Sequence, residues 1–450
     1  MKKIKYILLL SSALTFGACD SKLDIEPQEQ ISDVLAFSDK NTAVGSLMGA
    51  YSRMQDLDAF GSMPQVIADF QSDNVNFVGT FPTLQDINNY NIISDNSSIQ
   101  TIWREHYRTI IAANAVIANT DGVNDPSYTA EEKAQSIAEA KFIRAMTYFQ
   151  MANLWGDAWI LTNGNSPAVP LILDPFVGEV TFPARATVAD VYAQVITDLT
   201  SAIPNLPNSL ASEGRASAAA AQGLLSRLYL YQGEWQKAAD MAQNVMSAGE
   251  FSLASNYSFF GGGSPTPEEV FTLLNSAIDN GRTGSGGWGS FYNSAQAGGR
   301  GDATYSGDLL ATYEVGDKRF SQLSTISGGA TFTTKFPDAV NYSDNVPLIR
   351  VTEMYLNRAE ALAELNGVNA ESLTLINALR SRAGLSDFNS GDFANAEAFL
   401  DAIANERRLE LAFEGHRRMD LLRRGKALRT AGPGAGISSP GDTYVLFPVP

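Results

Sequence analysis

Apolar residues recur at every third or fourth position along most of this chain, which is the spacing of helices with one buried face. The first such stripe is formed by Val44, Leu47, Met48, Tyr51 and Met54. Comparable stripes predict helices over about 99–111, 131–155 and 188–202, and Thr187 is a suitable N-cap for the last of these. The pattern therefore predicts an all-α fold.

Two later segments are typical of helix hairpins. Residues 214–253 have Gly233 between two apolar stripes, and alanines early in the first helix leave room for a neighbouring helix to approach closely. Residues 352–365 and 370–382 form a second pair around an Asn-Gly turn, and one further helix is predicted over about 396–424. Hairpins with glycine at the turn and alanines at the packing positions resemble tetratricopeptide repeats.

Between these helical regions the pattern changes. From about 261 to 345 the chain is dense in Gly, Ser, Thr and aromatic residues and has little helical period, which predicts loops and a few short strands. The chain is expected to fold as one unit over 41–450, with helical blocks at about 41–260 and 346–430 that carry this loop-rich insert. A rigid scaffold with irregular loops is a common way to present binding residues.

The N-terminus has the features of a bacterial lipoprotein signal. Lysines precede an apolar run over residues 6–16, and Gly17-Ala18 comes directly before Cys19. Residues 1–18 are therefore predicted to be a signal peptide, and 19–40 a tether that begins with a lipidated Cys19. Acyl chains on this cysteine would anchor the protein in membrane lipid.

Composition excludes several functional classes. Cys19 is the only cysteine, so the chain cannot form an internal disulfide. His106 and His416 are the only histidines, which are too few for a histidine-rich metal site and argue against a catalytic triad. The formal net charge of −17 makes nucleic acid a poor partner. The glycine-rich runs lack the lysine and the βαβ context of a phosphate-binding loop. No catalytic residue, metal site or cofactor is expected.

Charged residues inside the predicted helices are expected to pair with one another. Glu353 and Glu360 lie two turns apart on one helix face, near Arg350 and Arg358, which favours buried ion pairs over a pair of catalytic carboxylates. In the segment 405–427, arginines alternate with acidic residues at helical spacing, which favours ion pairs over an anion site.

Two loop stretches combine aromatic rings with amide and charged groups. Sugar rings have apolar C–H faces surrounded by hydroxyl groups, so flat rings and hydrogen-bonding side chains together suit them. Trp288 is flanked by glycines, so it is expected either to stack on a ligand or to fold back onto the scaffold. The residues expected to contact ligand are Asp73, Asn74, Phe77 and Tyr90 from the first stretch and Trp288, Tyr292, Asn293 and Arg300 from the second.

Two motifs are the most specific features of the sequence: VPLIRVTEMYLNRAEAL at 346–362 and NERRLELAFEGHRRMDLLRRGKA at 405–427. With the order of the other segments, they resemble the SusD/RagB family of outer-membrane lipoproteins. The resemblance implies a SusD-like fold, in which tetratricopeptide-like helix pairs support a loop-rich ligand-binding region with few short strands. It also implies a cell-surface protein, anchored in the outer membrane through acylated Cys19, that passes ligand to a SusC-like TonB-dependent β-barrel transporter.

Three functions stay open at this point. Capture of oligosaccharides is favoured by the loop aromatics and amides. Capture of peptides, as the RagB branch of the family suggests, would depend more on main-chain hydrogen bonds. In the third, the protein is a structural lid whose helices contact only the transporter.

Overall fold

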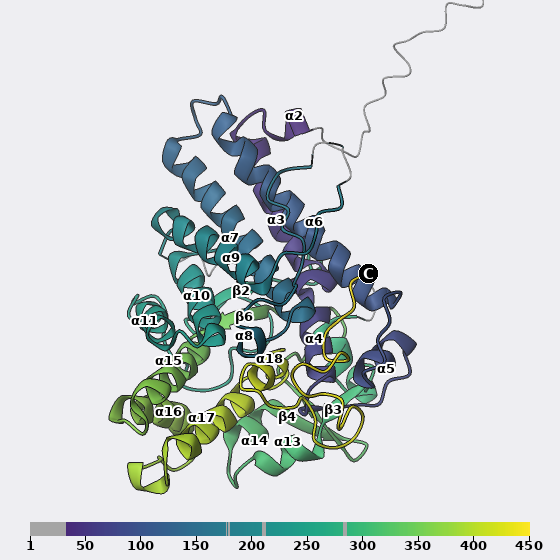
Figure 1. The fold of residues 1–450 in the computed structure, drawn as a ribbon, viewed down its shortest axis with the longest axis vertical. Coiled ribbons are helices and arrows are strands. Elements are labelled where there is room, and N and C mark those ends of the chain that lie inside the picture. Colours follow the sequence, from purple (N-terminus) through teal and green to yellow (C-terminus); the bar gives the residue numbers. More distant parts are fainter. Residues whose placement is uncertain (1–32, 177, 179–180, 209–212, 282–285) are drawn as a thin grey trace, which may run out of the picture.

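The computed structural model describes residues 33–450 apart from 177, 179–180, 209–212 and 282–285 (Figure 1). The predicted signal peptide, Cys19 and most of the tether lie outside the described residues. Within the described part, helices dominate and the strands are short, which confirms the predicted all-α class. No helix of this part is long and apolar enough to cross a membrane.

Helices form most of the first half of the chain. They are α2 (Asp33–Ala36), α3 (Lys40–Gln55), α4 (Met63–Phe70), α5 (Pro82–Asn88), α6 (Ser97–Asn119), α7 (Ala130–Trp155), α8 (Trp159–Thr162) and α9 (Val188–Ala202), with a π-helical turn at Leu57–Gly61. The helix α9 begins where predicted because the side chains of Thr187 and Asp190 each accept a hydrogen bond from the other's backbone N–H. The helices predicted over 131–155 and 188–202 are confirmed, to within one residue.

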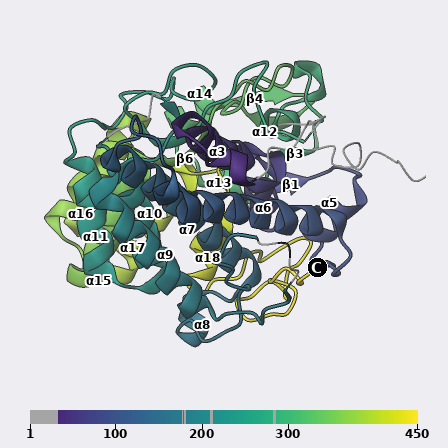
Figure 2. The same cartoon turned by 90° about the horizontal axis from the view of Figure 1, so that it is seen from above.

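Both predicted hairpins are present. They consist of α10 (Ala218–Gln232) with α11 (Trp235–Met246), and α15 (Val351–Asn366) with α16 (Ala370–Ala383). Gly233 ends α10 with a φ of 75°, a left-handed conformation that glycine adopts without strain. The helix α11 packs on α15, so the two hairpins stack. Figure 2 shows them on one side of the molecule, away from α5 and the strand β1 (Val75–Phe77).

The insert between the hairpins consists of short elements. They are β2 (Glu269–Leu273), α12 (Trp288–Tyr292), β3 (Ala303–Tyr305), α13 (Gly307–Thr312), α14 (Lys318–Leu323), β4 (Ser324–Ser327), β5 (Ala330–Thr333) and β6 (Val346–Arg350). The strands form three antiparallel pairs: β1 with β3, β2 with β6, and β4 with β5. In the first pair Asn76 lies opposite Thr304, and this pairing joins the insert to the N-terminal helices.

The prediction of one continuous helix over 396–424 was wrong. The structure has two helices there, α17 (Ala396–Glu410) and α18 (Arg417–Leu422). Gly415, in the turn between them, has a φ of 79°. The buried ammonium group of Lys335 donates hydrogen bonds of 2.8 Å to the carbonyl oxygens of Glu410 and Ala412. A side chain from the insert thus pairs with carbonyl groups at the end of α17, and Arg350 donates a further hydrogen bond of 3.3 Å to the Glu410 carbonyl oxygen.

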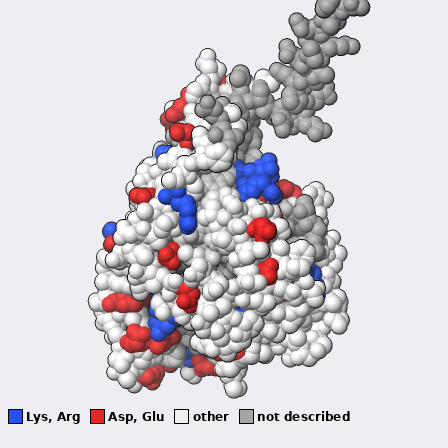
Figure 3. All heavy atoms as spheres, turned by 45° about the vertical axis from the view of Figure 1, so that its right-hand side comes forward, with Lys and Arg blue, Asp and Glu red and all other residues white. Residues whose placement is uncertain are grey.

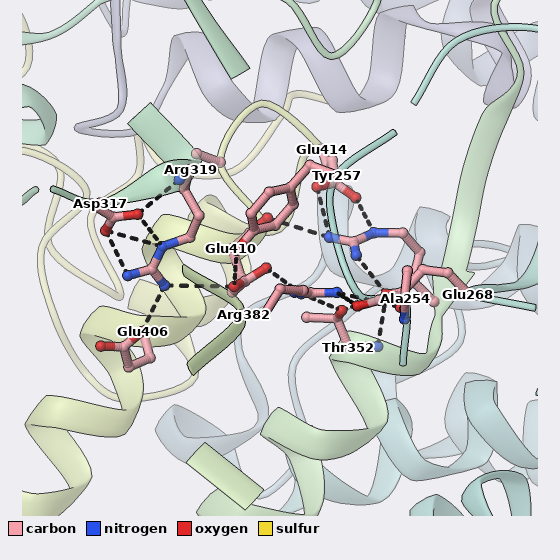
Figure 4. A network of polar contacts seen from close by, with 12 residues as sticks. Ala254, Tyr257, Glu268, Asp317, Arg319, Thr352, Arg382, Glu406, Glu410 and Glu414 are labelled. Atoms are coloured by element: carbon pink, nitrogen blue, oxygen red, sulfur yellow. Dashed lines mark hydrogen bonds and ion pairs between the residues drawn. The ribbon is translucent and has the colours of Figure 1, made fainter. Parts of the chain in front are cut away.

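Arginine–carboxylate pairs fill the space between the C-terminal helices and the insert, as Figure 4 shows. Arg319 bonds Asp317 at 2.7 Å and Glu406 at 2.6 Å, and Arg382 bonds Glu410 at 2.8 Å. All five side chains are at most 2% exposed. Burial opposes ionisation of Glu410, but Arg382 and the other cations around it lower its pKa below the ordinary value. The ion pairs predicted in 405–427 are confirmed.

Glu353 and Glu360 are buried and paired, as expected, but their partners come from other helices. Arg227 of α10 bonds Glu353 at 2.6 Å, and Arg423 bonds Glu360 at 2.5 Å. The arginines nearest to them in sequence pair elsewhere. These two carboxylates therefore hold helices together.

His106 is buried in α6, where the charged form of its ring is disfavoured. The imidazole Nδ1 lies 2.8 Å from the carbonyl oxygen of Ile102, and desolvation lowers the pKa of His106 to about 4. An unfolded chain keeps the ordinary histidine pKa of about 6.5. Between these values the folded protein binds fewer protons than the unfolded chain, so this group costs stability as the pH falls from 6.5 towards 4.

We expect His106→Asn, whose amide can donate the same hydrogen bond, to weaken the pH dependence of stability. The wild-type protein should lose roughly 1–3 kcal/mol more than the variant between pH 7 and pH 4.5. Urea denaturation of both proteins at the two pH values measures this difference. An equal loss in the two proteins would contradict it.

Candidate functional site

A polar cleft lies beside β1, between β3, α13 and the segment 429–433. Its volume is about 260 Å³, slightly below the range of about 300–1,000 Å³ that is typical of small-molecule sites. Apolar wall residues are Val75, Phe77 and Tyr305, and polar groups come from Asp73, Asn76, Asn88, Asp308 and Thr430 among others. We call this site the β1 cleft.

The predicted residues Asp73 and Phe77 line the β1 cleft, and Asn74 is buried next to it. Arg417 donates two hydrogen bonds of 2.7 Å to Asp73, and Arg408 donates one of 2.8 Å to Asn74. Burial opposes ionisation of Asp73, but Arg417 lowers its pKa below the ordinary value. Asp73 is therefore a charged wall residue in a fixed orientation.

The predicted residue Arg300 lies near the surface between two aromatic rings. Its guanidinium carbon is 4.7 Å from the ring centre of Phe291 and 5.9 Å from that of Phe81. Its Nε donates a hydrogen bond of 2.5 Å to Asp302. Phe81 is 51% exposed, which is unusual for so large an apolar ring. We call Phe81, Arg300 and Asp302 the Arg300 platform.

The Arg300 platform and the β1 cleft are neighbours across Gly79. A Cβ atom at this glycine would lie 2.6 Å from the Phe77 ring and 2.8 Å from Cγ of Asp302. The ring that lines the cleft and the carboxyl group of the platform are thus both packed against the Gly79 backbone. A side chain there would push the two parts of the site apart.

Trp288 and Tyr292 of α12 are buried beneath the surface loops. The Trp288 ring centre is 4.2 Å from that of Phe336, and the Tyr292 hydroxyl donates a hydrogen bond of 2.7 Å to Asp69. Of the two arrangements expected for Trp288, the structure has the one folded back onto the scaffold.

Asn293 and Tyr90 are also buried, and their polar groups are occupied. Asn293 donates a hydrogen bond of 2.6 Å to the carbonyl oxygen of Phe336, and the Tyr90 hydroxyl donates one to the carbonyl oxygen of Gln71. Like Trp288 and Tyr292, these side chains present almost no surface to a ligand. Of the predicted residues, only those at the β1 cleft and the Arg300 platform are brought together at an accessible site.

Several exposed groups of the site were not among the residues expected to contact ligand, although Asn76 and Phe81 lie within the first loop stretch that the sequence indicated. Asn76 is the exposed residue of β1, in which buried and exposed positions alternate, and this alternation was readable in the sequence. Phe81 and Gln85 follow in the same stretch. Thr430 comes from a distant segment, and nothing in the local sequence indicates that it reaches the cleft.

The molecular face near the site carries few charges. Figure 3 brings forward the right-hand side of Figure 1, where α5 lies, and shows charged residues scattered over a mostly uncharged surface. The described ranges contain no group of three or more His, Cys, Asp or Glu side chains placed to hold a metal ion. A surface with few charges suits a neutral, hydroxyl-rich ligand.

The fold and the site together define a class of protein. Its helical scaffold presents an open polar cleft, and the acidic residues Asp73 and Asp302 are each tied to an arginine. Side chains held in this way are fixed for contact with a ligand, as a binding site requires.

Comparison with known families agrees with this class. Residues 20–230 match the family described as "Starch-binding associating with outer membrane", and residues 332–436 match the SusD family. This chain belongs to the SusD family of binding proteins, which is not a family of enzymes. The predicted family is confirmed.

Related proteins match nearly the whole chain. "SusD-like protein P25" from Formosa agariphila is 26% identical, over 94% of this chain and 89% of the relative. Among solved structures, a SusD superfamily protein from Bacteroides thetaiotaomicron has a TM-score of 0.82 and 26% identity, over 91% of this chain and 96% of that one. A "Laminarin binding SusD-like protein" has a TM-score of 0.75 and 25% identity, over 92% and 97%. The predicted SusD-like fold is confirmed.

Proposed function

We propose that this protein binds neutral oligosaccharides through the β1 cleft and the Arg300 platform. The observation that carries the proposal is the exposed Phe81 ring beside the Arg300 guanidinium group, with Asn76, Gln85 and Asp302 nearby. An exposed ring can stack on the C–H face of a sugar, while amide and carboxyl groups hydrogen-bond its hydroxyl groups.

The relatives support this class of ligand and this location. One relative is described as laminarin-binding and another, from Bacteroides vulgatus, as a putative sugar binding protein. The matched family description names starch and the outer membrane. In our proposal, acylated Cys19 anchors the protein in that membrane, and a SusC-like TonB-dependent transporter receives the bound oligosaccharide.

We expect Phe81→Ala to weaken oligosaccharide binding about tenfold to a hundredfold. Removing one stacking ring costs on the order of 1–3 kcal/mol, which corresponds to that change in affinity. Calorimetry with the chain lacking residues 1–19, titrated with a panel of neutral oligosaccharides and peptides, measures it. Phe182→Ala is the matched control, since Phe182 is 93% exposed and does not line the β1 cleft.

Each outcome of this experiment is informative. Equal affinity of Phe81→Ala and wild type would exclude the Arg300 platform as the sugar site. Binding of peptides alone would favour the peptide-capture function. A protein that binds neither ligand but co-purifies with a β-barrel transporter would be a structural lid.

A further inference from the structure

One wall of the β1 cleft is formed by a surface loop, residues 429–437, which we call the Gly434 loop. Its residues 429–433 line the cleft. The base of the loop is closed by a hydrogen bond of 2.9 Å from the Leu428 N–H to the Ser438 carbonyl oxygen. Closing the base does not fix the tip of a loop, so the width of the cleft depends on contacts that the loop makes further along.

Arg429 ties the beginning of the Gly434 loop to the segment that precedes β1. Its Nε donates a hydrogen bond of 2.9 Å to the Ser72 carbonyl oxygen. Its Nη1 donates bonds of 3.1 and 3.2 Å to the carbonyl oxygens of Asn88 and Pro433. The tip of the loop, around Gly434, is held by a different residue.

That residue is Tyr90, whose backbone has a φ of 57°, in the left-handed region that bulky side chains rarely adopt. Its side chain is 1% exposed, and its hydroxyl donates a hydrogen bond to the carbonyl oxygen of Gln71, the residue before Ser72. A residue keeps such a conformation where the surrounding contacts impose it, and these positions cluster at functional sites. The Tyr90 ring is thus fixed relative to the β1 side of the cleft.

The backbone of Gly434 lies directly against this ring. A Cβ atom at position 434 would overlap Cδ2 and Cε2 of Tyr90. The φ of Gly434 is 82°, which glycine adopts without strain. The close approach of the loop to the ring therefore needs glycine, and it determines how far the adjoining wall residues lie from β1.

We propose that Tyr90 is a positioning residue whose ring, through Gly434, sets the width of the β1 cleft. Neither of the two residues lines the cleft, so Tyr90 acts on a ligand through the Gly434 loop. The cleft is small, about 260 Å³, and a small displacement of one wall changes which saccharides fit. This consequence for saccharides rests on the proposed function, whereas the width itself can be measured without ligand.

Electron paramagnetic resonance between two spin labels measures the width. The chain without residues 1–19 contains no cysteine, so Asn76→Cys on β1 and Ala431→Cys on the loop supply the two labelling sites. Both residues are exposed and line the cleft. In this background Gly434→Ala should lengthen the distance between the labels by about 1–2 Å. The reason is that carbon atoms in contact lie about 3.5–4.0 Å apart, so the overlap with the ring has to be relieved.

Gly436→Ala is the matched control. Gly436 also has a positive φ, 85°, but a Cβ atom there meets nothing within 4 Å. The control introduces the same kind of backbone strain without a contact to Tyr90, so it should leave the distance unchanged. Adding Tyr90→Ala to Gly434→Ala removes the ring and makes room for the new methyl group, so the double variant should shorten the distance again.

Tyr90→Leu keeps the test decisive if Gly434→Ala does not fold. It removes the flat ring but retains an apolar side chain, and it should broaden the distribution of distances between the labels. The proposal is overturned by equal distances in Gly434→Ala and the wild-type protein, by a shift that Tyr90→Ala does not reverse, or by an unchanged distribution in Tyr90→Leu.

Titration of the unlabelled variants with maltotriose and laminaritriose separates this proposal from the proposed function. Gly434→Ala should weaken binding of the trisaccharide that the wild-type protein binds on the order of tenfold, the equivalent of about 1.4 kcal/mol. Gly436→Ala should leave the affinity unchanged. A longer distance between the labels with unchanged affinity would support the role of Tyr90 and exclude the β1 cleft as the sugar site.

Discussion

Replacing Arg350 by methionine is expected to lower the free energy of unfolding by about 3–5 kcal/mol. Its guanidinium group donates hydrogen bonds of 2.8 and 3.0 Å to Glu414 and one of 3.0 Å to Glu268. All three side chains are buried. Methionine fills a similar volume but leaves the two buried carboxylates with one cation fewer, and a buried charge that loses its partner is strongly destabilising.

The midpoint of urea unfolding, with an unchanged slope, measures this loss. Lys237→Met is the matched control, because Lys237 and Glu234 form an ion pair of 3.1 Å with both side chains more than half exposed. Solvent screens such a pair, so the control should change stability by less than about 1 kcal/mol. A loss in Arg350→Met as small as in the control would mean that the remaining cations, Arg382 and Lys335, neutralise both carboxylates.

Trp155→Ala is expected to cost about 3–5 kcal/mol and to release the C-terminal segment. Trp155 is fully buried at the end of α7. Its ring centre lies 5.0 Å from that of Trp103 and 6.1 Å from that of Phe447, and its Nε1 donates a hydrogen bond of 3.0 Å to the carbonyl oxygen of Pro448. The side chain therefore fills core volume and also holds the end of the chain against α6 and α7.

Urea unfolding measures the first effect, and limited proteolysis followed by mass spectrometry measures the second. Residues 440–450 should be cleaved faster in Trp155→Ala than in the wild-type protein. Trp235→Ala, which removes a partly buried indole from α11, should cost less and leave that cleavage unchanged. Equal protection of residues 440–450 in all three proteins would show that other contacts hold the segment.

The candidate site shows why residue type alone could not define it. The sequence contains the aromatic and amide residues of the site, and the stretch from Asp73 to Tyr90 was identified because these types cluster there. Phe81 and Trp288 are both large rings in stretches that the sequence pattern predicts to be loops, yet Phe81 is half-exposed and Trp288 packs on Phe336. Their exposure depends on segments distant in sequence, so no local pattern distinguishes them.

The contacts of the charged residues also depend on segments that are distant in sequence. Helical spacing correctly predicted that Glu353 is paired, but its partner Arg227 lies on another helix. The same kind of pattern predicted a continuous helix through 411–416, where Lys335 of the insert takes up the carbonyl groups at the end of α17. Neither contact can be predicted from residues that lie within one or two helical turns of each other in the sequence.

By itself, the sequence determined the long helices over 131–155 and 188–202, the N-cap Thr187, the two hairpins and the family. These features depend on apolar spacing and capping groups that act between near neighbours, and on motifs that are contiguous in the chain. Only the tertiary structure decided which aromatic rings reach the surface and which carboxylate holds each arginine. Burial and ion pairing depend on distances between residues far apart in the chain, and folding alone sets those distances.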